Sequence, residues 1–180
     1  MSTPSTTQPA SALPADDVSR TATIVHADDK GLTHLGVGAG TYTILISGEQ
    51  TGGRYTMIDM LVPAGGPPPH RHDFEEIFHI LEGELEITFR DEVHHVGPGQ
   101  SVNIPANAPH GFKVVSQTPA RFLCICLPAG QDEFFKLVGE VLPTRTTPPT
   151  PPTPEVIAER RGIMLANAAR FHSEFLPPRN

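Results

Sequence analysis

The sequence predicts an all-β domain, folded as an antiparallel barrel or sandwich. Apolar and polar residues alternate with a period of two in six short windows, as in strands with one buried face. Gly, Pro, Asn or Asp bounds each window, and no helical pattern separates them. Short strands at this spacing are typical of antiparallel barrels and sandwiches. The six windows are residues 41–49, 54–62, 75–90, 101–106, 110–116 and 120–128.

Composition divides the chain into four parts. Residues 1–20 are rich in Ser, Thr, Pro and Ala and are expected to be flexible. Residues 21–142 hold the strand windows and form the β domain. Residues 143–154 form a Pro-rich linker that favours extended polyproline conformation, with a ligand for a Pro-recognition module as the alternative. Residues 155–176 read as one C-terminal helix.

The C-terminal helix has recognisable start signals. Thr153 can cap it, Pro154 suits the first helical position, and Glu155 favours the positive end of the helix dipole. Helical spacing brings five residues near one face, which is expected to pack on the domain or on a partner chain: Ile157, Met164, Ala168, Phe171 and Phe175.

Bulk properties exclude some partners. The formal charge of -7 argues against nucleic acid or an anionic membrane surface as the main partner. No apolar run approaches the roughly 20 residues of a membrane span. The first residues lack the basic and apolar regions of a secretory signal, so a cytoplasmic location is expected. The only cysteines, Cys124 and Cys126, lie two apart on one predicted strand, where a pair of small buried core residues is expected rather than a disulfide or a functional thiol.

The stretch "PPPHRHDFEEIFHILEG", residues 67–83, concentrates polar residues that can bind a metal. On an extended chain His70 and His72 project to one side, and counting in twos adds Glu76, followed by Phe78 and Ile80. Two imidazoles and one carboxylate on one face suit a divalent transition-metal ion. Glu75 falls on the opposite face and is expected to be an exposed neighbour, with replacement of Glu76 as the alternative.

A fourth ligand is available further along the chain. In "GPGQSVNIPANAPHGFKVV", His110 enters a new strand with Phe112 and Val114 on its own face. Strand pairing can bring His110 opposite the first three ligands. The side chains of Phe78, Ile80, Phe112 and Val114 would then line an apolar substrate pocket beside the site.

Both stretches resemble the paired signature motifs of the cupin superfamily. His70, His72, Glu76 and Gly83 match the first motif without a gap. Gly99, Pro105 and His110 match the second, whereas Asn107 replaces its second glycine and Val114 stands where asparagine often occurs. Asparagine tolerates left-handed backbone geometry, so the turn should survive. Over residues 41–142 the chain further resembles single-domain bacterial cupins of the quercetin dioxygenase-like group.

The resemblance implies an antiparallel cupin β-barrel of jelly-roll type, with His70, His72, Glu76 and His110 as metal ligands. It implies one divalent ion of Fe, Mn, Ni, Co, Cu or Zn, a small-molecule ligand, and a homodimer. The expected activity is that of a dioxygenase on a flavonol-like or other enolisable compound. Glu76 could also leave the metal and act as the catalytic base. The alternatives are a non-catalytic binding module, a cupin with Lewis-acid chemistry such as an isomerase or decarboxylase, and a purely structural metal.

The remaining histidines and a glycine-rich stretch receive no functional role. The stretch "GVGAG" at 36–40 lacks the spacing and following helix of a nucleotide-binding turn and is expected to be a loop. His79 faces outward by parity, and two others lie in a predicted turn. The histidines concerned are His26, His34, His79, His94, His95 and His172.

Overall fold

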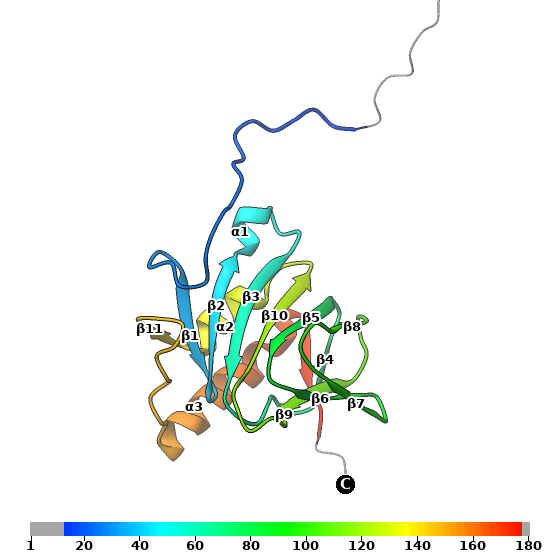
Figure 1. Ribbon diagram of the computed structural model, residues 1–180, viewed down its shortest axis with the longest axis vertical. Helices are drawn as coiled ribbons and strands as arrows, with labels where there is room; N and C mark the ends of the chain where they lie inside the picture. The colour runs from blue at the N-terminus through cyan, green and yellow to red at the C-terminus, as the bar shows by residue number, and fades with distance from the viewer. Residues whose placement is uncertain (1–12, 178–180) are drawn as a thin grey trace, which may run out of the picture.

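The computed structural model describes residues 13–177 and contains two antiparallel β-sheets packed face to face (Figure 1). The seven-stranded sheet contains, in spatial order, β11 (Glu140–Leu142), β1 (Thr33–Val37), β2 (Gly40–Ile46), β3 (Thr56–Val62), β10 (Ala120–Leu127), β5 (Glu75–Glu82) and β8 (Ser101–Ile104). The five-stranded sheet contains β12 (Ser173–Phe175), β4 (His70–His72), β9 (His110–Val114), β6 (Leu85–Phe89) and β7 (Glu92–Val96).

The hydrophobic core lies between the two sheets. Alternate residues of β5 and β10 are buried, as a strand with one core face requires. Phe78, Phe112 and Phe122 meet edge to face, with ring centroids 5.3 to 5.6 Å apart, and so connect β5, β9 and β10 across the core. The predicted all-β jelly roll is confirmed. In the described part of the chain, however, no strand pairing joins the two sheets into a continuous barrel.

The expectation of no helix among the strands was wrong. A short helix, α1 (Gly48–Thr51), and a longer one, α2 (Gln131–Val138), lie within residues 21–142. In α2, Phe134, Phe135 and Val138 are buried at helical spacing, but eight residues give too short a pattern to stand out between strands. The "GVGAG" stretch forms the ends of β1 and β2 and the hairpin turn between them.

The C-terminal helix begins as predicted but ends earlier. In α3 (Pro154–Asn167) the Thr153 side chain accepts a hydrogen bond from the Val156 N–H. A 3-10 helix (Ala168–Phe171) follows, and His172 then takes a left-handed conformation with φ 57°. The chain continues as β12, which pairs with β4. The prediction of one helix over 155–176 was wrong after Asn167, because residues 173–175 have sheet partners there.

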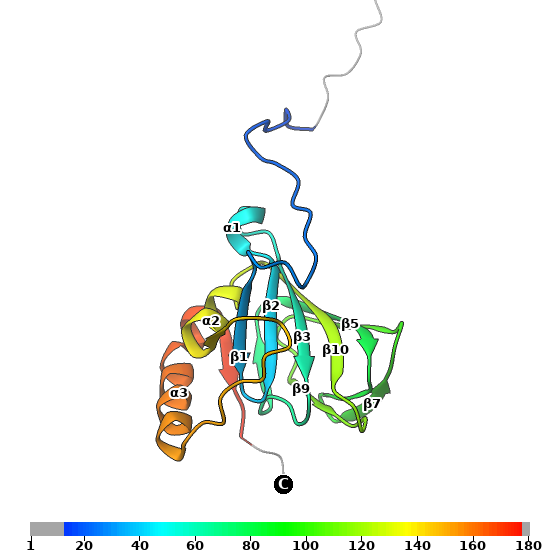
Figure 2. The same cartoon turned by 60° about the vertical axis from the view of Figure 1, so that its left-hand side comes forward.

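The C-terminal segment covers the end of the jelly roll beside β4. Figure 2 shows α2, α3 and β12 together on one side of the sheets. The rings of Phe134 in α2 and Phe171 in the 3-10 helix lie 5.3 Å apart, and Met164, Phe171 and Phe175 pack against the core. Ile157, which was expected on the packed face, is 53% exposed.

At the other end of the chain, residues 13–32 form no strand or helix and lead away from the sheets (Figure 1). The rest of the segment predicted to be flexible, residues 1–12, lies outside the described residues. No helix within residues 13–177 has the length and apolar character needed to cross a membrane.

Candidate metal centre

Three strands from both sheets bring the four predicted metal ligands together. His70 and His72 lie on β4, and His110 is the direct partner of His70 on the neighbouring strand β9. Glu76 reaches the same point from β5 in the opposite sheet. One ligand atom from each of these residues lies within 4.8 Å of the others.

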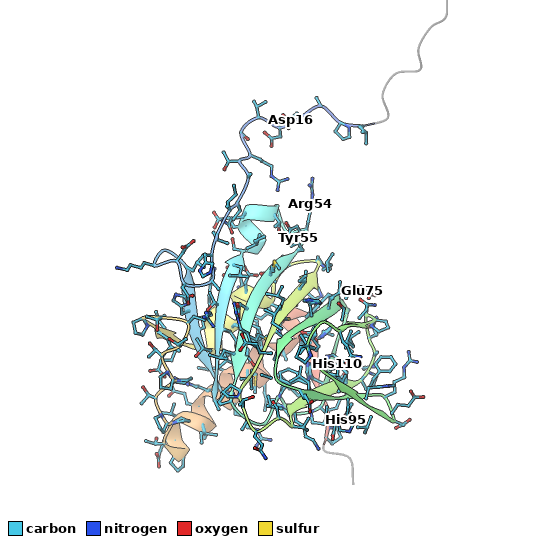
Figure 3. All side chains as sticks on the ribbon, viewed as in Figure 1. Asp16, Arg54, Tyr55, Glu75, His95 and His110 are labelled. Carbon is cyan, nitrogen blue, oxygen red and sulfur yellow. The ribbon has the colours of Figure 1, made fainter. Side chains whose placement is uncertain are left out.

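The bend between β4 and β5 preserves the predicted alternation. The chain crosses from one sheet to the other at Asp73 and Phe74, and the Phe74 ring stacks on His72 with centroids 3.8 Å apart. His72, Glu76 and His110 are all nearly fully buried, and Figure 3 shows His110 inside the domain. Counting in twos through the bend therefore identified the inward face correctly.

Backbone carbonyls orient all three imidazole rings. His70, His72 and His110 each place Nδ1 2.9 Å from a carbonyl oxygen two residues away. A carbonyl oxygen can only accept, so each Nδ1 carries a proton and donates it. Whenever a ring held in this way is neutral, it presents the lone pair of Nε2 to the centre, which is how a metal-binding histidine is normally held. The carbonyl groups belong to Pro68, Phe74 and Ala108.

The charges in this cluster are strongly coupled. Glu76 Oε2 lies 3.3 Å from His72 Nε2 and 3.1 Å from His110 Nε2. Burial raises the pKa of Glu76, but hydrogen bonds from His110 and His72 outweigh it, so the pKa lies well below its usual value. Burial lowers the pKa of His110, but Glu76 more than offsets this and raises it. Burial lowers the pKa of His70 to about 4, so this ring is neutral at pH 7.

This donor set fits a divalent transition-metal ion. Three imidazole nitrogens and one carboxylate oxygen are ligands that Fe, Mn, Co, Ni, Cu and Zn accept in proteins. The carboxylate also sits against two Nε2 atoms, a contact that needs a proton or a cation between the partners. With neutral rings, a bound divalent ion would leave one net positive charge at the site.

Glu75 is not part of this cluster. It faces away from the interior and accepts hydrogen bonds from the Asn103 side chain and the Ala106 N–H. These bonds hold the loop that leads to Asn107, whose φ of 67° is the left-handed geometry expected at that glycine position. The Asn107 N–H donates to the carbonyl oxygen of His72. The replacement of glycine by asparagine therefore preserves the turn, and the alternative in which Glu75 is the ligand was wrong.

The other histidines lie outside the cluster. His79 is half-buried on the outer face of β5 and contacts the Ser101 hydroxyl. His94 and His95 are exposed as expected, but they lie on strand β7 rather than in a turn. Figure 3 labels His95. His34 is buried, with Nδ1 2.9 Å from the Thr43 hydroxyl. His26 and His172 are exposed.

A small cavity adjoins the centre. Its volume is about 90 Å³, and His70 and Glu76 form part of its wall. Most of the remaining lining is aromatic or aliphatic, and three further lining residues, Tyr42, Gln131 and Ser173, carry polar groups. The apolar part of the lining includes Met60, Phe112, Phe134, Phe135, Met164 and Phe175.

Of the four residues predicted to line a pocket, only Phe112 lines this cavity. Phe78 and Ile80 are buried in the core, and Val114 packs against it. All of them face inward as their parity predicts. The prediction of a pocket role was wrong for these three because β5 and β9 carry them past the ligands into the closely packed interior, whereas the cavity is bounded by α2 and the C-terminal segment.

The two cysteines are buried and free, as expected. Their sulfur atoms lie 3.7 Å apart, and the Cys124 thiol donates to Glu76 Oε1 at 3.3 Å. The contact with Cys126, followed by burial, raises the pKa of Cys124 well above its usual value, so it is a protonated donor to the carboxylate. The sequence pattern placed both cysteines on the core face but did not indicate their contact with a metal ligand.

Comparison with known proteins supports the same assignment. Residues 57–126 match the family described as the cupin domain. The chain is 32% identical over 89 residues to an uncharacterized protein of Methanocaldococcus jannaschii, a match that covers 48% of this chain and 71% of the relative. It is 26% identical over 112 residues to quercetin 2,3-dioxygenase of Bacillus subtilis, covering 59% of this chain but only 32% of that enzyme.

A solved structure shares the fold as well. The polyketide cyclase RemF from Streptomyces resistomycificus aligns with a TM-score of 0.51 and 29% sequence identity, over 59% of this chain and 80% of the cyclase. The two-sheet jelly roll, the motif residues at its centre and these matches agree with one another. This chain belongs to the cupin superfamily.

Proposed function

We propose that the protein is a metal-dependent dioxygenase that acts on a compact, enolisable small molecule. The observation that carries this proposal is the convergence of three oriented Nε2 atoms and one carboxylate at the wall of an apolar cavity. The similarity to quercetin 2,3-dioxygenase supports the reaction class, although the chain spans only about a third of that enzyme.

The size of the cavity limits the substrate. A dry cavity of about 150 Å³ holds a single benzene molecule, and this one measures about 90 Å³. A three-ring flavonol does not fit while the C-terminal segment keeps its position. We therefore favour a compact enolisable compound over a flavonol.

The residues around the centre have distinct roles in this proposal. A divalent metal held by His70, His72, Glu76 and His110 would supply Lewis acidity and a binding position for oxygen. Glu76 acts as the base that takes a proton from the enolisable carbon, and the Cys124 thiol steadies its other oxygen. The aromatic lining excludes water from the reacting groups.

Oxygen uptake with a panel of compact enolisable compounds tests this proposal. Glu76→Gln should abolish turnover more severely than it lowers the metal content. Glu75→Gln provides the matched control, because this neighbouring carboxylate faces outward, and it should retain turnover. Full oxygen uptake by Glu76→Gln would show that Glu76 is not the base.

A second candidate function is Lewis-acid catalysis without oxygen. The similarity to the polyketide cyclase RemF, which extends over most of that enzyme, favours it. Substrate consumption without oxygen uptake in the same assay would identify this activity. Stoichiometric binding without any product would instead identify a non-catalytic binding module.

We also propose that the protein forms a homodimer. Three apolar side chains in residues 13–32 are largely exposed: Leu13 is 80% accessible, Val18 is 86% accessible and Ile24 is 92% accessible. Strand β11 lies at one edge of the seven-stranded sheet and has a strand partner on one side only. A second copy would cover such surfaces. Light scattering after size exclusion should give twice the mass of one chain, whereas the mass of a single chain would contradict this proposal.

A further inference from the structure

Gln131 occupies an unusual position beside the candidate centre. Strand β10 places Cys126 directly opposite Glu76, and after a short turn the chain begins α2 at Gln131. Gln131 lines the same cavity as His70 and Glu76, and only 8% of its surface is exposed. The side chain is thus held inside the domain, next to the candidate metal ligands.

The Gln131 carboxamide oxygen is fully buried and has no hydrogen-bond partner among residues 13–177. A buried polar group without a partner lowers the stability of the fold, because its lost hydration is not replaced. Leucine, of similar size, would fill the same space without this cost. The carboxamide is therefore poorly explained as a packing residue in a cavity that is otherwise mostly apolar.

No described neighbour of Gln131 donates a hydrogen bond to its carboxamide oxygen. The neighbouring lining residues Phe134, Phe135 and Phe112 offer no donor or acceptor. The other polar lining residues outside the cluster are Tyr42 and Ser173. Burial raises the pKa of the Tyr42 hydroxyl well above its usual value, so it is neutral, and the Ser173 hydroxyl donates to the carbonyl oxygen of Phe171. Because the cavity measures only about 90 Å³, a ligand that fills it contacts both the carboxamide and the candidate metal centre.

We propose that Gln131 determines substrate specificity by hydrogen bonding to a hydroxyl or amino group of the substrate. The inference rests on the proposed function, because the other end of the substrate is assigned to the metal. The net positive charge of the loaded centre favours an anionic oxygen donor there. The substrate class is thus a compact, enolisable oxo acid that carries a hydroxyl or amino group at its far end.

Two nearly isosteric probes test this assignment. In 3-hydroxypyruvate a hydroxyl replaces the terminal methyl group of 2-oxobutyrate, and both compounds carry the same metal-binding oxo-acid group. Binding would be followed by the visible spectrum of the Co²⁺-loaded protein. The wild type should bind 3-hydroxypyruvate roughly three- to tenfold more tightly, as expected for one net hydrogen bond. Gln131→Leu should remove or reverse this preference.

A matched variant and a stability measurement separate recognition from a structural role. Gln100→Leu changes a glutamine in an exposed turn and should keep the wild-type preference. Gln131→Leu should raise the melting temperature by roughly 2–12 °C, because it removes an unpartnered buried amide oxygen. A structural glutamine would give a lower melting temperature instead.

The outcomes are distinguishable from failure of the proposed function. The role of Gln131 would be overturned if Gln131→Leu kept the wild-type preference for 3-hydroxypyruvate. It would also be overturned if neither probe bound to protein with a normal cobalt spectrum. Either result would leave the assignment of the metal centre intact. A protein that takes up no cobalt would overturn both the centre and the inference built on it.

Discussion

Replacing Glu76 by glutamine in the metal-free protein tests the electrostatics of the centre. The change keeps the shape of the side chain but removes the negative charge that lies 3.1 Å from His110 Nε2 and 3.3 Å from His72 Nε2. A hydrogen bond to a charged group contributes about 1.5–3 kcal/mol. For a chain of this size, that loss corresponds to a melting temperature lower by roughly 3–12 °C.

The effect should depend on pH in a defined direction. The pKa of His110 is higher in the folded protein than in the unfolded chain, where it is about 6.5. The resulting stabilisation is therefore fully present below about pH 6.5 and is lost as the pH rises through the pKa of the folded protein. The lowered pKa of Glu76 gives stability that is complete above about pH 4.5 and is lost as the pH falls through its folded value. Both contributions are therefore complete between about pH 4.5 and 6.5.

Urea unfolding in the presence of a chelator measures this difference. Glu76→Gln should lose about 1.5–3 kcal/mol at about pH 6, and the loss should shrink as the pH rises toward about 9. Glu75→Gln serves as the control, since Glu75 contacts only an amide side chain and a backbone N–H and its effect should not vary over this range. The same loss for Glu76→Gln at both pH values would refute the reasoning.

Three further predictions concern the architecture around the centre. Phe175→Ala should cost about 2 kcal/mol in urea unfolding and enlarge the cavity toward the roughly 150 Å³ that holds one benzene ring, visible as benzene binding that the wild type lacks. Absence of such binding would contradict the position of Phe175 in the cavity wall. Arg121→Leu should cost about 3–5 kcal/mol, because it leaves the Asp59 carboxylate buried without its partner. A loss below about 1 kcal/mol, the value of a surface ion pair, would contradict this. Gly83→Ala should destabilise the fold by more than about 1 kcal/mol, because the φ angle of Gly83 is +73° and an added Cβ would lie 2.7 Å from the backbone of Ala120. Gly162→Ala has open space around it in α3 and should stabilise the fold by about 0.5–1 kcal/mol. Equal melting temperatures of the two variants would refute this contrast.

The sequence predicted the candidate centre well because its residues follow local rules. Alternation along β4 and β5 places His70, His72 and Glu76 on one face, and this alternation continues through the bend at Phe74. The second motif places His110 on a strand that pairs with β4. Local periodicity and motif spacing are sufficient when each ligand lies on a regular strand near a turn.

The cavity could not be predicted in the same way because distant segments build it. Phe134 and Gln131 come from α2, and Phe175 comes from a strand that the helical spacing of residues 155–176 concealed. An apolar residue every three or four positions fits a helix, yet Phe175 is partly buried in a strand that pairs with β4. Pairing of β12 with β4 thus determined the structure of this segment in place of its local helical pattern. Phe78 and Ile80 face inward as predicted, but they pack in the hydrophobic core and do not line the cavity.

The central claim is that His70, His72, Glu76 and His110 hold one metal ion. The most direct test is the metal content of protein purified without added metal or a histidine tag, measured by elemental analysis for the wild type, His72→Ala and the outward-facing control His79→Ala. We predict a near-stoichiometric amount of transition metal in the wild type and in His79→Ala, and loss of this metal in His72→Ala. An equally low metal content in all three proteins would contradict the claim.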